Sequence, residues 1–373
     1  MAPVACLVSV LVILIVLWDA FETIVLPRRV TRRVRLTRII MFTGWKLWRA
    51  IARVIRRGPR REAFLSYFGP LSVIVLLGTW AVSLIAGFAL LQMALGSRLV
   101  APEGTVRFGT DLYMSGTTFF TLGLGDVTPR SGAARFITVL ESGLGFGFLA
   151  MVISYLPVLY QAFSRREVRI SLLDAWAGSP PTAGELLRRL GRDGQETLLS
   201  PFLQEWEIWS AELLETMISY PILGYFRSQH DNQSWLAALT TVLDSCAVII
   251  SSVDRAPVRT ASLTFAMARH AVVDLCQVLS TPPRYPRRDR LTPSDRERLW
   301  AQLRAAGWVI REHEESGARM RELRGMYEPY VNALAANLLV RLPAWLAEDG
   351  VRDNWQRTAW RSIGTDHSDP TEP

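Results

Sequence analysis

Apolar residues form three long runs in the first half of the chain, and these runs predict membrane-spanning helices. The first lies in residues 1–26 and has no charged residue from Val4 to Trp18. The second is uncharged from Ala63 to Ser97, and the third extends from Ala134 to Phe163. About 20 apolar residues in a helix span the hydrocarbon core of a bilayer. A cleaved signal peptide is the alternative for the first run, but that run lacks a basic start and a small-residue cleavage site.

The second half has a different pattern, in which apolar residues recur at helical spacing between breaks rich in proline and glycine. This pattern predicts a helical domain over residues 165–362, followed by a disordered tail over 363–373. Thr182 and Ser294 are the expected N-caps of two of its helices. Alternating strands and helices and a glycine-rich phosphate loop do not occur in this half, so a nucleotide-binding domain is not indicated.

Basic residues are concentrated between the first two apolar runs. Residues 28–61 hold thirteen of the 42 Lys and Arg residues of a chain whose net charge is +8. Basic loops stay on the cytoplasmic side of a membrane, which predicts a cytoplasmic segment over 27–66, an external N-terminus and a cytoplasmic C-terminal domain. Nucleic-acid binding is the alternative for so basic a stretch, but the flanking spans favour a membrane surface and no nucleic-acid partner.

Part of this basic segment has the pattern of an amphipathic helix. One face holds five apolar residues: Trp45, Trp48, Ile51, Ala52 and Ile55. The other face holds five cations: Lys46, Arg49, Arg53, Arg56 and Arg57. We therefore expect residues 28–61 to contact anionic lipid headgroups, with the tryptophans at the interface.

The stretch between the second and third runs, residues 110–129, does not read as a simple turn. Its first half predicts a short helix, N-capped by Thr110 or Asp111 and too short to cross a membrane. Its second half, from Thr121 to Asp126, reads Thr-Leu-Gly-Leu-Gly-Asp. Glycine permits left-handed backbone angles, and alternating the sense of the backbone turns successive carbonyl groups to the same side. A row of such carbonyls can replace the water shell of a cation.

At these residues the sequence resembles the potassium-channel pore family, whose pattern is Thr-Val-Gly-Tyr-Gly-Asp after a short pore helix. Thr121, Gly123, Gly125 and Asp126 match the pattern, and leucine replaces the usual valine and tyrosine. The resemblance places a pore domain at residues 67–164. It implies an all-α membrane protein with three transmembrane helices, a re-entrant pore loop and a C-terminal α-helical cytosolic domain.

The resemblance also implies specific roles for these residues in potassium conduction. The expected selectivity filter consists of Thr121, Leu122, Gly123, Leu124 and Gly125, with K+ held at the backbone carbonyls of the first four. Asp126 is expected at the outer mouth, and filter support is expected from Thr117, Thr118 and Glu141. One chain supplies one filter strand, so the implied assembly is a homotetramer with K+ as the permeant ion and no cofactor.

The third apolar run would be the inner helix that carries the gate. Alignment to the family from Asp126 places Gly145 at the usual hinge, although close helix packing explains the glycine equally well. Helical spacing then predicts that the cavity is lined by Phe146, Leu149, Ile153 and Pro157. Pro157 is expected to kink the helix near the inner gate, under control of the cytosolic domain.

Other functions are less well supported by the sequence. The pairs His230–Asp231 and His270–Cys276 are the only candidates for catalysis, and isolated histidines on helices are mostly structural, so we predict no enzyme and no catalytic residue. A non-selective cation channel and a membrane-anchored sensor or scaffold with a vestigial pore loop remain open, and the ligand of the cytosolic domain cannot be read. Lys46 is the only lysine, which indicates GC-rich codon usage and a bacterial source. The apolar spans predict a multi-pass protein of the plasma or inner membrane.

Overall fold

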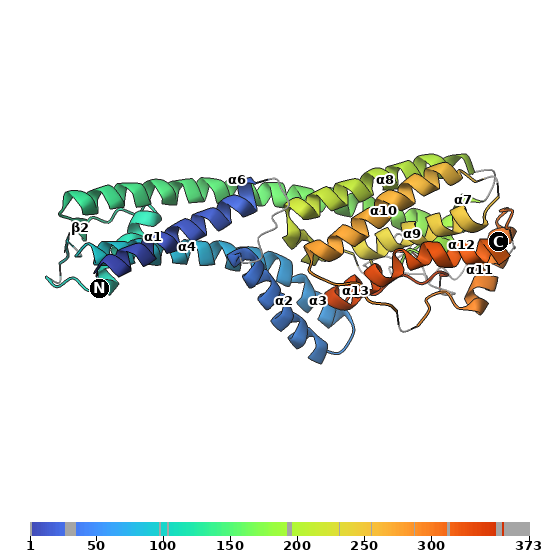
Figure 1. The fold of residues 1–373 in the computed structure, drawn as a ribbon, viewed down its shortest axis with the longest axis horizontal. Coiled ribbons are helices and arrows are strands. Elements are labelled where there is room, and N and C mark those ends of the chain that lie inside the picture. The colour runs from blue at the N-terminus through green and yellow to red at the C-terminus, as the bar shows by residue number, and fades with distance from the viewer. Residues whose placement is uncertain are drawn as a thin grey trace, which may run out of the picture. The chain divides into compact units, whose positions relative to one another are not determined.

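A computed structural model shows a chain built almost wholly of helices (Figure 1). The structure describes residues 2–26, 35–96, 98–102, 104–191, 196–230, 232–254, 256–286, 288–311, 314–347 and 353. Two strands of two residues, β1 (Leu99–Val100) and β2 (Thr128–Pro129), pair antiparallel. The predicted all-α membrane fold is confirmed. The expected tail, 363–373, lies outside the described residues.

The chain divides into two compact units. Unit 1 comprises residues 1–163 together with 216–227, and unit 2 comprises 164–215 and 228–373. The first stretch of unit 1 ends at Phe163, within α6. Residues 216–227 differ from expectation, because the sequence pattern assigns them to the C-terminal helical domain whereas the chain folds them into unit 1.

The helices of each unit follow the chain order. Unit 1 holds α1 (Ala2–Ala20), the π-helix η1 (Phe21–Val25), α2 (Leu36–Val54), α3 (Pro59–Ser66), α4 (Phe68–Ala94), α5 (Phe108–Phe119), the first part of α6 (Gly132–Ala177) and the 3-10 helix η3 (Pro221–Tyr225). Unit 2 holds the rest of α6, α7 (Ala183–Leu190), most of α8 (Glu196–Ser219), α9 (Trp235–Ser252), α10 (Val258–Val278), α11 (Pro293–Ala305), α12 (Glu314–Gly325) and α13 (Glu328–Leu338).

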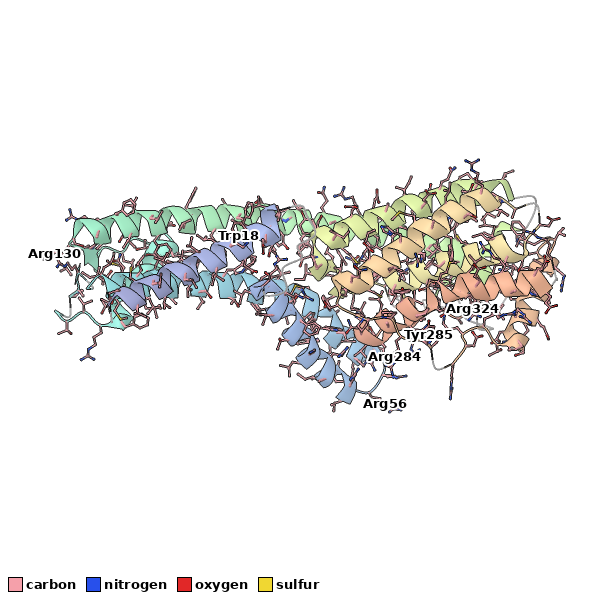
Figure 2. The ribbon with its side chains drawn as sticks, in the orientation of Figure 1. Trp18, Arg56, Arg130, Arg284, Tyr285 and Arg324 are labelled. Atoms are coloured by element: carbon pink, nitrogen blue, oxygen red, sulfur yellow. The ribbon has the colours of Figure 1, made fainter. Side chains whose placement is uncertain are left out.

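The core of unit 1 forms where α1 lies against α4 (Figure 1). Trp80 and Phe88 of α4 are almost fully buried there beside Ile13. Gly87 permits this close approach, because a Cβ atom at that position would lie 2.8 Å from the Cγ1 atom of Ile13. The outer face of α1 remains apolar and uncovered, with Trp18 53% exposed (Figure 2). An uncovered apolar face of this kind suits contact with lipid.

Within the described part of the chain, four stretches are long and apolar enough to cross a membrane: Ala2–Val25, Pro59–Ala94, Gly132–Ala177 and Trp235–Ser252. The first three overlap the three expected spans. The fourth is helix α9, and nearly all of its residues are buried inside unit 2 by contacts with α7, α10, α12 and α13. A helix surrounded by protein has no surface left for lipid, so α9 has the character of a core helix rather than a span.

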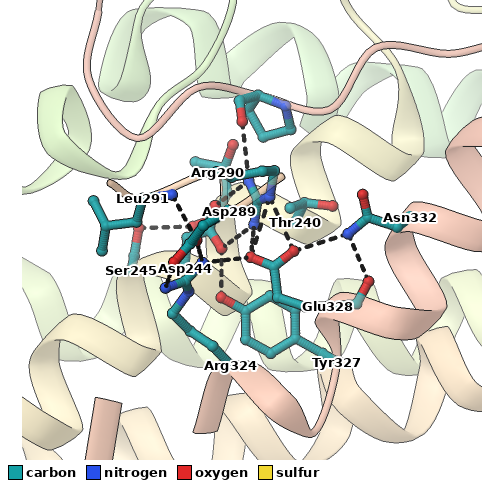
Figure 3. Close-up of polar contacts among 12 residues, drawn as sticks. Thr240, Asp244, Ser245, Asp289, Arg290, Leu291, Arg324, Tyr327, Glu328 and Asn332 are labelled. Carbon is teal, nitrogen blue, oxygen red and sulfur yellow. Dashed lines mark hydrogen bonds and ion pairs between the residues drawn. The ribbon is translucent and has the colours of Figure 1, made fainter. Parts of the chain in front are cut away.

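A buried ionic cluster joins α9, the segment before α11 and the start of α13 (Figure 3). The guanidinium of Arg290, in the segment before α11, donates hydrogen bonds to both carboxylate oxygens of Asp244 at 2.8 and 2.9 Å and to Glu328 at 2.8 Å. The hydroxyl of Tyr327 also donates to Asp244. Burial alone would lower the pKa of Arg290, but Asp244 and Glu328 raise that pKa well above its ordinary value. The cluster therefore holds buried charges in mutually compensating pairs.

The structure tests three expected helix caps. Thr182 is confirmed, because its side chain accepts a hydrogen bond from the backbone N–H of Glu185 at 3.2 Å. The prediction of Ser294 as a cap is wrong. Helix α11 is capped by Thr292, whose hydroxyl accepts a hydrogen bond from the Asp295 N–H. For α5 the cap is Arg107 rather than Thr110 or Asp111, because the chain enters its helix three residues earlier than the polar pattern indicates.

Candidate functional site

The segment Thr121–Asp126 leaves the C-terminal end of α5 with an alternating backbone. Thr121, Gly123 and Gly125 have φ angles of 56°, 58° and 78°, all in the left-handed region. Alternation of this kind turns successive carbonyl groups to the same side of the chain. A left-handed threonine is uncommon and costs free energy, which marks a position where the backbone is constrained.

The two glycines are needed here for backbone conformation rather than for space. A Cβ atom built at Gly123 or Gly125 would meet nothing within 4 Å. Any L-residue would nevertheless be strained by about 1–2 kcal/mol in the left-handed region. The side chains of Leu122 and Leu124 are 62% and 63% exposed in the single chain.

The last turn of α5 supports the start of this segment through its backbone. The carbonyl of Thr117 accepts a hydrogen bond from the Leu122 N–H at 2.8 Å, and the carbonyl of Thr118 accepts one from the Thr121 N–H at 3.0 Å. The Thr117 hydroxyl instead donates to the carbonyl of Met114 within its own helix. Both threonines, expected as filter support, therefore contact the segment through main-chain atoms.

At the far end of the segment, Asp126 is held by a residue that the sequence interpretation missed. The hydroxyl of Tyr113 on α5 donates a hydrogen bond to Asp126 Oδ2 at 2.8 Å. An aromatic side chain two helical turns before Thr121 was the available signal. Tyr113 and the α5 carbonyls thus fix both ends of the segment to one short helix.

Glu141 of α6 lies against α5 and is 1% exposed. The Ser115 hydroxyl of α5 is within hydrogen-bond distance of Glu141 Oε1 and of the Ile85 carbonyl of α4, the latter at 2.7 Å. The partner of this carboxylate is a serine of α5, a contact that the sequence pattern does not reveal. Three helices consequently meet at one buried polar point.

Gly145 lies where α6 presses against the end of α5. A Cβ atom there would be 2.0 Å from the carbonyl oxygen of Phe119, whereas one at Gly143 or Gly147 would meet nothing within 4 Å. Close packing therefore requires glycine at this position. A hinge at Gly145 stays a prediction, since α6 passes through it without a break (Figure 1).

The residues expected to line the cavity form one exposed stripe on α6 in the single chain. Phe146, Leu149 and Ile153 are 67%, 54% and 63% exposed, and Pro157 follows on the same side within the uninterrupted helix. Three large apolar side chains in one uncovered stripe are what an inner helix presents to a cavity or to neighbouring copies.

The prediction that the apolar face of α2 contacts lipid is wrong in part. Trp45 is 2% exposed and packs on Phe68 and Tyr225, at ring-centroid distances of 4.9 and 5.0 Å. Ala52 is fully buried, and Trp48 stacks on Phe64 at 4.4 Å. Both tryptophans face protein, because an apolar stripe indicates burial without indicating what covers it.

A different apolar edge of α2 is uncovered. It comprises Leu47, Ile51 and Val54, which are 65%, 45% and 88% exposed. Arg56 is exposed just beyond the helix (Figure 2). The basic residues from 28 to 33 lie outside the described residues.

Candidate catalytic or metal-binding residues are not gathered into a site in the part of the chain that the structure describes. No group of three His, Cys, Asp or Glu side chains there is placed to hold a metal ion. Cys276 is buried, and its thiol faces the carbonyl of Tyr330 at 3.6 Å.

Comparison with known proteins identifies the region that contains this site. Residues 72–161 match a protein-family model described as an ion channel, of the two-transmembrane-helix potassium-channel type. The chain is also 24% identical over 199 residues to the uncharacterized membrane protein YdjJ of Bacillus subtilis (strain 168). That alignment covers 50% of this chain and 54% of the relative, so the chain spans about half the length of the relative it matches. No solved structure matches.

Proposed function

We propose that the chain is one subunit of a potassium-selective channel, which conducts K+ passively through a Thr-Leu-Gly-Leu-Gly-Asp filter. The observation that carries the proposal is the alternation of left-handed residues at Thr121, Gly123 and Gly125, directly after a short helix between two apolar spans. Backbone carbonyls turned to one side can replace the hydration shell of K+. The ion-channel match over residues 72–161 supports conduction as the activity.

A ring of carbonyls requires four such strands, so the proposed assembly is a homotetramer. K+ would bind at the carbonyls of Thr121, Leu122, Gly123 and Leu124, with the Thr121 hydroxyl toward the inner cavity and Asp126 at the outer mouth. The C-terminal end of α5 carries a partial negative charge that would stabilise a cation in the cavity. In the tetramer, the exposed stripe on α6 would face that cavity or a neighbouring subunit.

The proposed orientation puts the N-terminus outside and the basic segment 28–61 on the cytoplasmic side of the bacterial plasma membrane. The exposed edge of α2 supports contact with anionic lipid, because Leu47 and Ile51 lie next to the cationic side of the helix. Lys46, Arg49 and Arg53 supply that charge. Unit 2 is then cytoplasmic and acts on the gate at the inner end of α6.

Flux measured on reconstituted protein tests the proposal. Liposomes that hold the full chain and a K+ gradient should release K+ and exclude Na+. Equal fluxes of the two ions would replace the proposal by a non-selective cation channel. No flux of either ion would favour a membrane-anchored scaffold with a vestigial loop.

Two glycine variants make the test specific to the filter. Gly123→Ala should abolish K+ flux, because alanine strains the left-handed backbone by about 1–2 kcal/mol and misplaces carbonyls. Gly104→Ala is the matched control, since Gly104 has φ +70° and open space around it but lies in the loop before α5. Equal loss of flux in both variants would show general destabilisation and contradict a specific role for Gly123.

A further inference from the structure

The segment 220–227 joins α8 to α9 in sequence yet packs inside unit 1. It begins at Tyr220, forms the 3-10 helix η3, and ends with Phe226 and Arg227. Tyr225 is 7% exposed and Phe226 is 5% exposed. Two nearly buried aromatic side chains in so short a connection are unusual for a loop, which normally lies on the surface. We call residues 220–227 the docking segment.

One side of the docking segment is fixed to the start of α4 and to its neighbours. The Tyr225 ring lies 5.0 Å from that of Trp45 and 5.4 Å from that of Phe68. The Phe226 ring occupies the space left by Gly69, where a Cβ atom would be 2.6 Å from its Cδ2 atom. Arg227 Nη1 lies 3.7 Å from Glu62 Oε2. The fit at Gly69 is so close that even a methyl group would displace the ring.

The other side of the docking segment contacts α6 on both sides of Pro157. Before the proline, the Tyr155 ring lies 5.9 Å from that of Tyr220. After it, Tyr160 and Phe163 lie 6.2 and 5.6 Å from Phe226. One short piece of chain therefore contacts α6 about half a turn before its internal proline and about one to two turns after it.

A proline inside a helix removes one backbone hydrogen bond and makes that point the natural place to bend. α6 nevertheless continues as one helix through Pro157. Contacts on both sides of the proline oppose bending, because a kink would move Tyr155 and Phe163 relative to each other and separate one of them from the segment. The segment thus holds α6 straight at Pro157.

We propose that the docking segment is a releasable splint that restrains α6 at Pro157 and through which unit 2 controls the gate. The segment follows the last turn of α8, whose residues up to Glu215 belong to unit 2, and it precedes α9 of unit 2, so a rearrangement of that unit can withdraw it. This inference rests on the proposed channel function and names its regulation. Docked aromatics restrain the inner helix, and their release permits the bend that opens the conduction path.

Flux through Phe226→Ala channels in K+-loaded liposomes is the first test. Loss of the aromatic contacts should raise K+ flux per channel by about threefold or more, the scale set by one aromatic pair. Selectivity should not change, because the filter is not touched. The same substitution in a Pro157→Ala background should have no effect on flux, since an alanine helix has no preferred bend to release. A fall in flux, no change, or an equal rise in the Pro157→Ala background would overturn the splint.

A matched pair on α4 checks that the effect comes from docking. Gly69→Leu should displace the Phe226 ring and raise flux as Phe226→Ala does, with the docking segment itself intact. Gly78→Leu is the control, because a Cβ atom at Gly78 meets nothing within 4 Å on the same helix. Equal effects of the two leucines would overturn the assignment.

A disulfide supplies a test that removes restraint reversibly. The Phe226 Cγ atom lies 3.0 Å from a Cβ atom built at Gly69, so the two Cβ atoms are at most about 4.5 Å apart, within disulfide range. Oxidised Gly69→Cys/Phe226→Cys channels should conduct less than the same channels after reduction. Equal flux before and after reduction, with the bond shown by mass spectrometry, would overturn the proposal.

Hydrogen exchange separates failure of the splint from failure of the channel function. Amides of residues 155–163 should exchange faster in Phe226→Ala than in the wild type, while those of α9 keep their rates. If the wild type conducts no ion, the channel proposal fails, and this measurement still reports on the splint. Unchanged exchange at 155–163 in a conducting protein would overturn the splint alone.

Discussion

Two regions of the molecule bury acidic side chains almost completely, but the partners of these carboxylates differ between the two regions. In unit 2, Asp244 is fully buried and meets the Arg290 guanidinium through two hydrogen bonds. In unit 1, Glu141 is 1% exposed and meets the Ser115 hydroxyl between three helices. A counter-charge offsets the cost of burying a carboxylate, whereas a hydroxyl offsets only part of it. We infer that Asp244 serves folding, whereas Glu141 occupies an energetically costly position beside the proposed filter.

The largest effect is expected from breaking the pair in unit 2. Arg290→Ala leaves Asp244 and Glu328 buried without their shared cation, which should lower the free energy of unfolding by about 3–5 kcal/mol. Hydrogen exchange of α9 amides in detergent would report the loss. The control is Arg319→Ala, since Arg319 and its partner Glu322 are both about half exposed and such pairs contribute little. Equal effects of the two substitutions would show that the buried cluster is not stabilising.

Asp19 at the end of α1 is an intermediate case, because this buried acid is 1% exposed and has mainly neutral partners. Its Oδ2 atom accepts hydrogen bonds from the Thr37 N–H and hydroxyl and from Trp80 Nε1, at 3.0, 2.6 and 2.9 Å. Arg35 Nε is more distant, at 3.8 Å from Oδ1. These contacts join α1, the start of α2 and α4.

Asp19→Ala should lower the thermal stability of unit 1, because each buried donor left without an acceptor costs about 1–3 kcal/mol. Thermal unfolding in detergent measures this. Ser9→Ala is the matched control: Ser9 is fully buried on the same helix, and its hydroxyl donates only to the Cys6 carbonyl one turn away. A larger loss in the serine variant would contradict the proposed junction at Asp19.

The sequence predicts best what depends on local pattern. The three spans, the Thr182 cap and the unusual backbone at Thr121–Asp126 follow from hydropathy, capping chemistry and alternating glycines. It does not predict the partners that come from distant positions. Tyr225 meets Trp45 across 180 residues of chain, and neither periodicity nor charge reveals that Trp45 is covered by protein rather than lipid. The Ser115 contact of Glu141 was missed for a related reason, because it depends on how α5 packs against α6, which includes a close approach at Gly145.

Glu141 itself tests whether the costly acid beside the filter is functional. Glu141→Ala removes its contact with Ser115, a loss of about 1–2 kcal/mol, and should lower the K+ to Na+ permeability ratio by loosening α5. Glu141→Gln keeps a polar group of the same shape and should retain more of the selectivity. Permeability ratios in planar bilayers measure both. Loss of thermal stability in Glu141→Ala with selectivity unchanged would place this acid with Asp244 as a folding residue.

The smallest effect is expected at the outer end of the filter. Tyr113→Phe removes one hydroxyl and its hydrogen bond to Asp126, which stabilises the segment by about 0.5–1.5 kcal/mol. The fold should be unaffected, because both side chains are exposed and the ring of phenylalanine retains the packing. K+ current through this variant should decline during sustained conduction. Without the hydrogen bond from Tyr113, Asp126 no longer holds the outer end of the filter, and the carbonyl groups lose their alignment. Asp126→Asn keeps an acceptor oxygen for Tyr113 and should decline less. An equally steady current in wild type and Tyr113→Phe would show that α5 fixes the filter through its backbone at Thr117 and Thr118 alone.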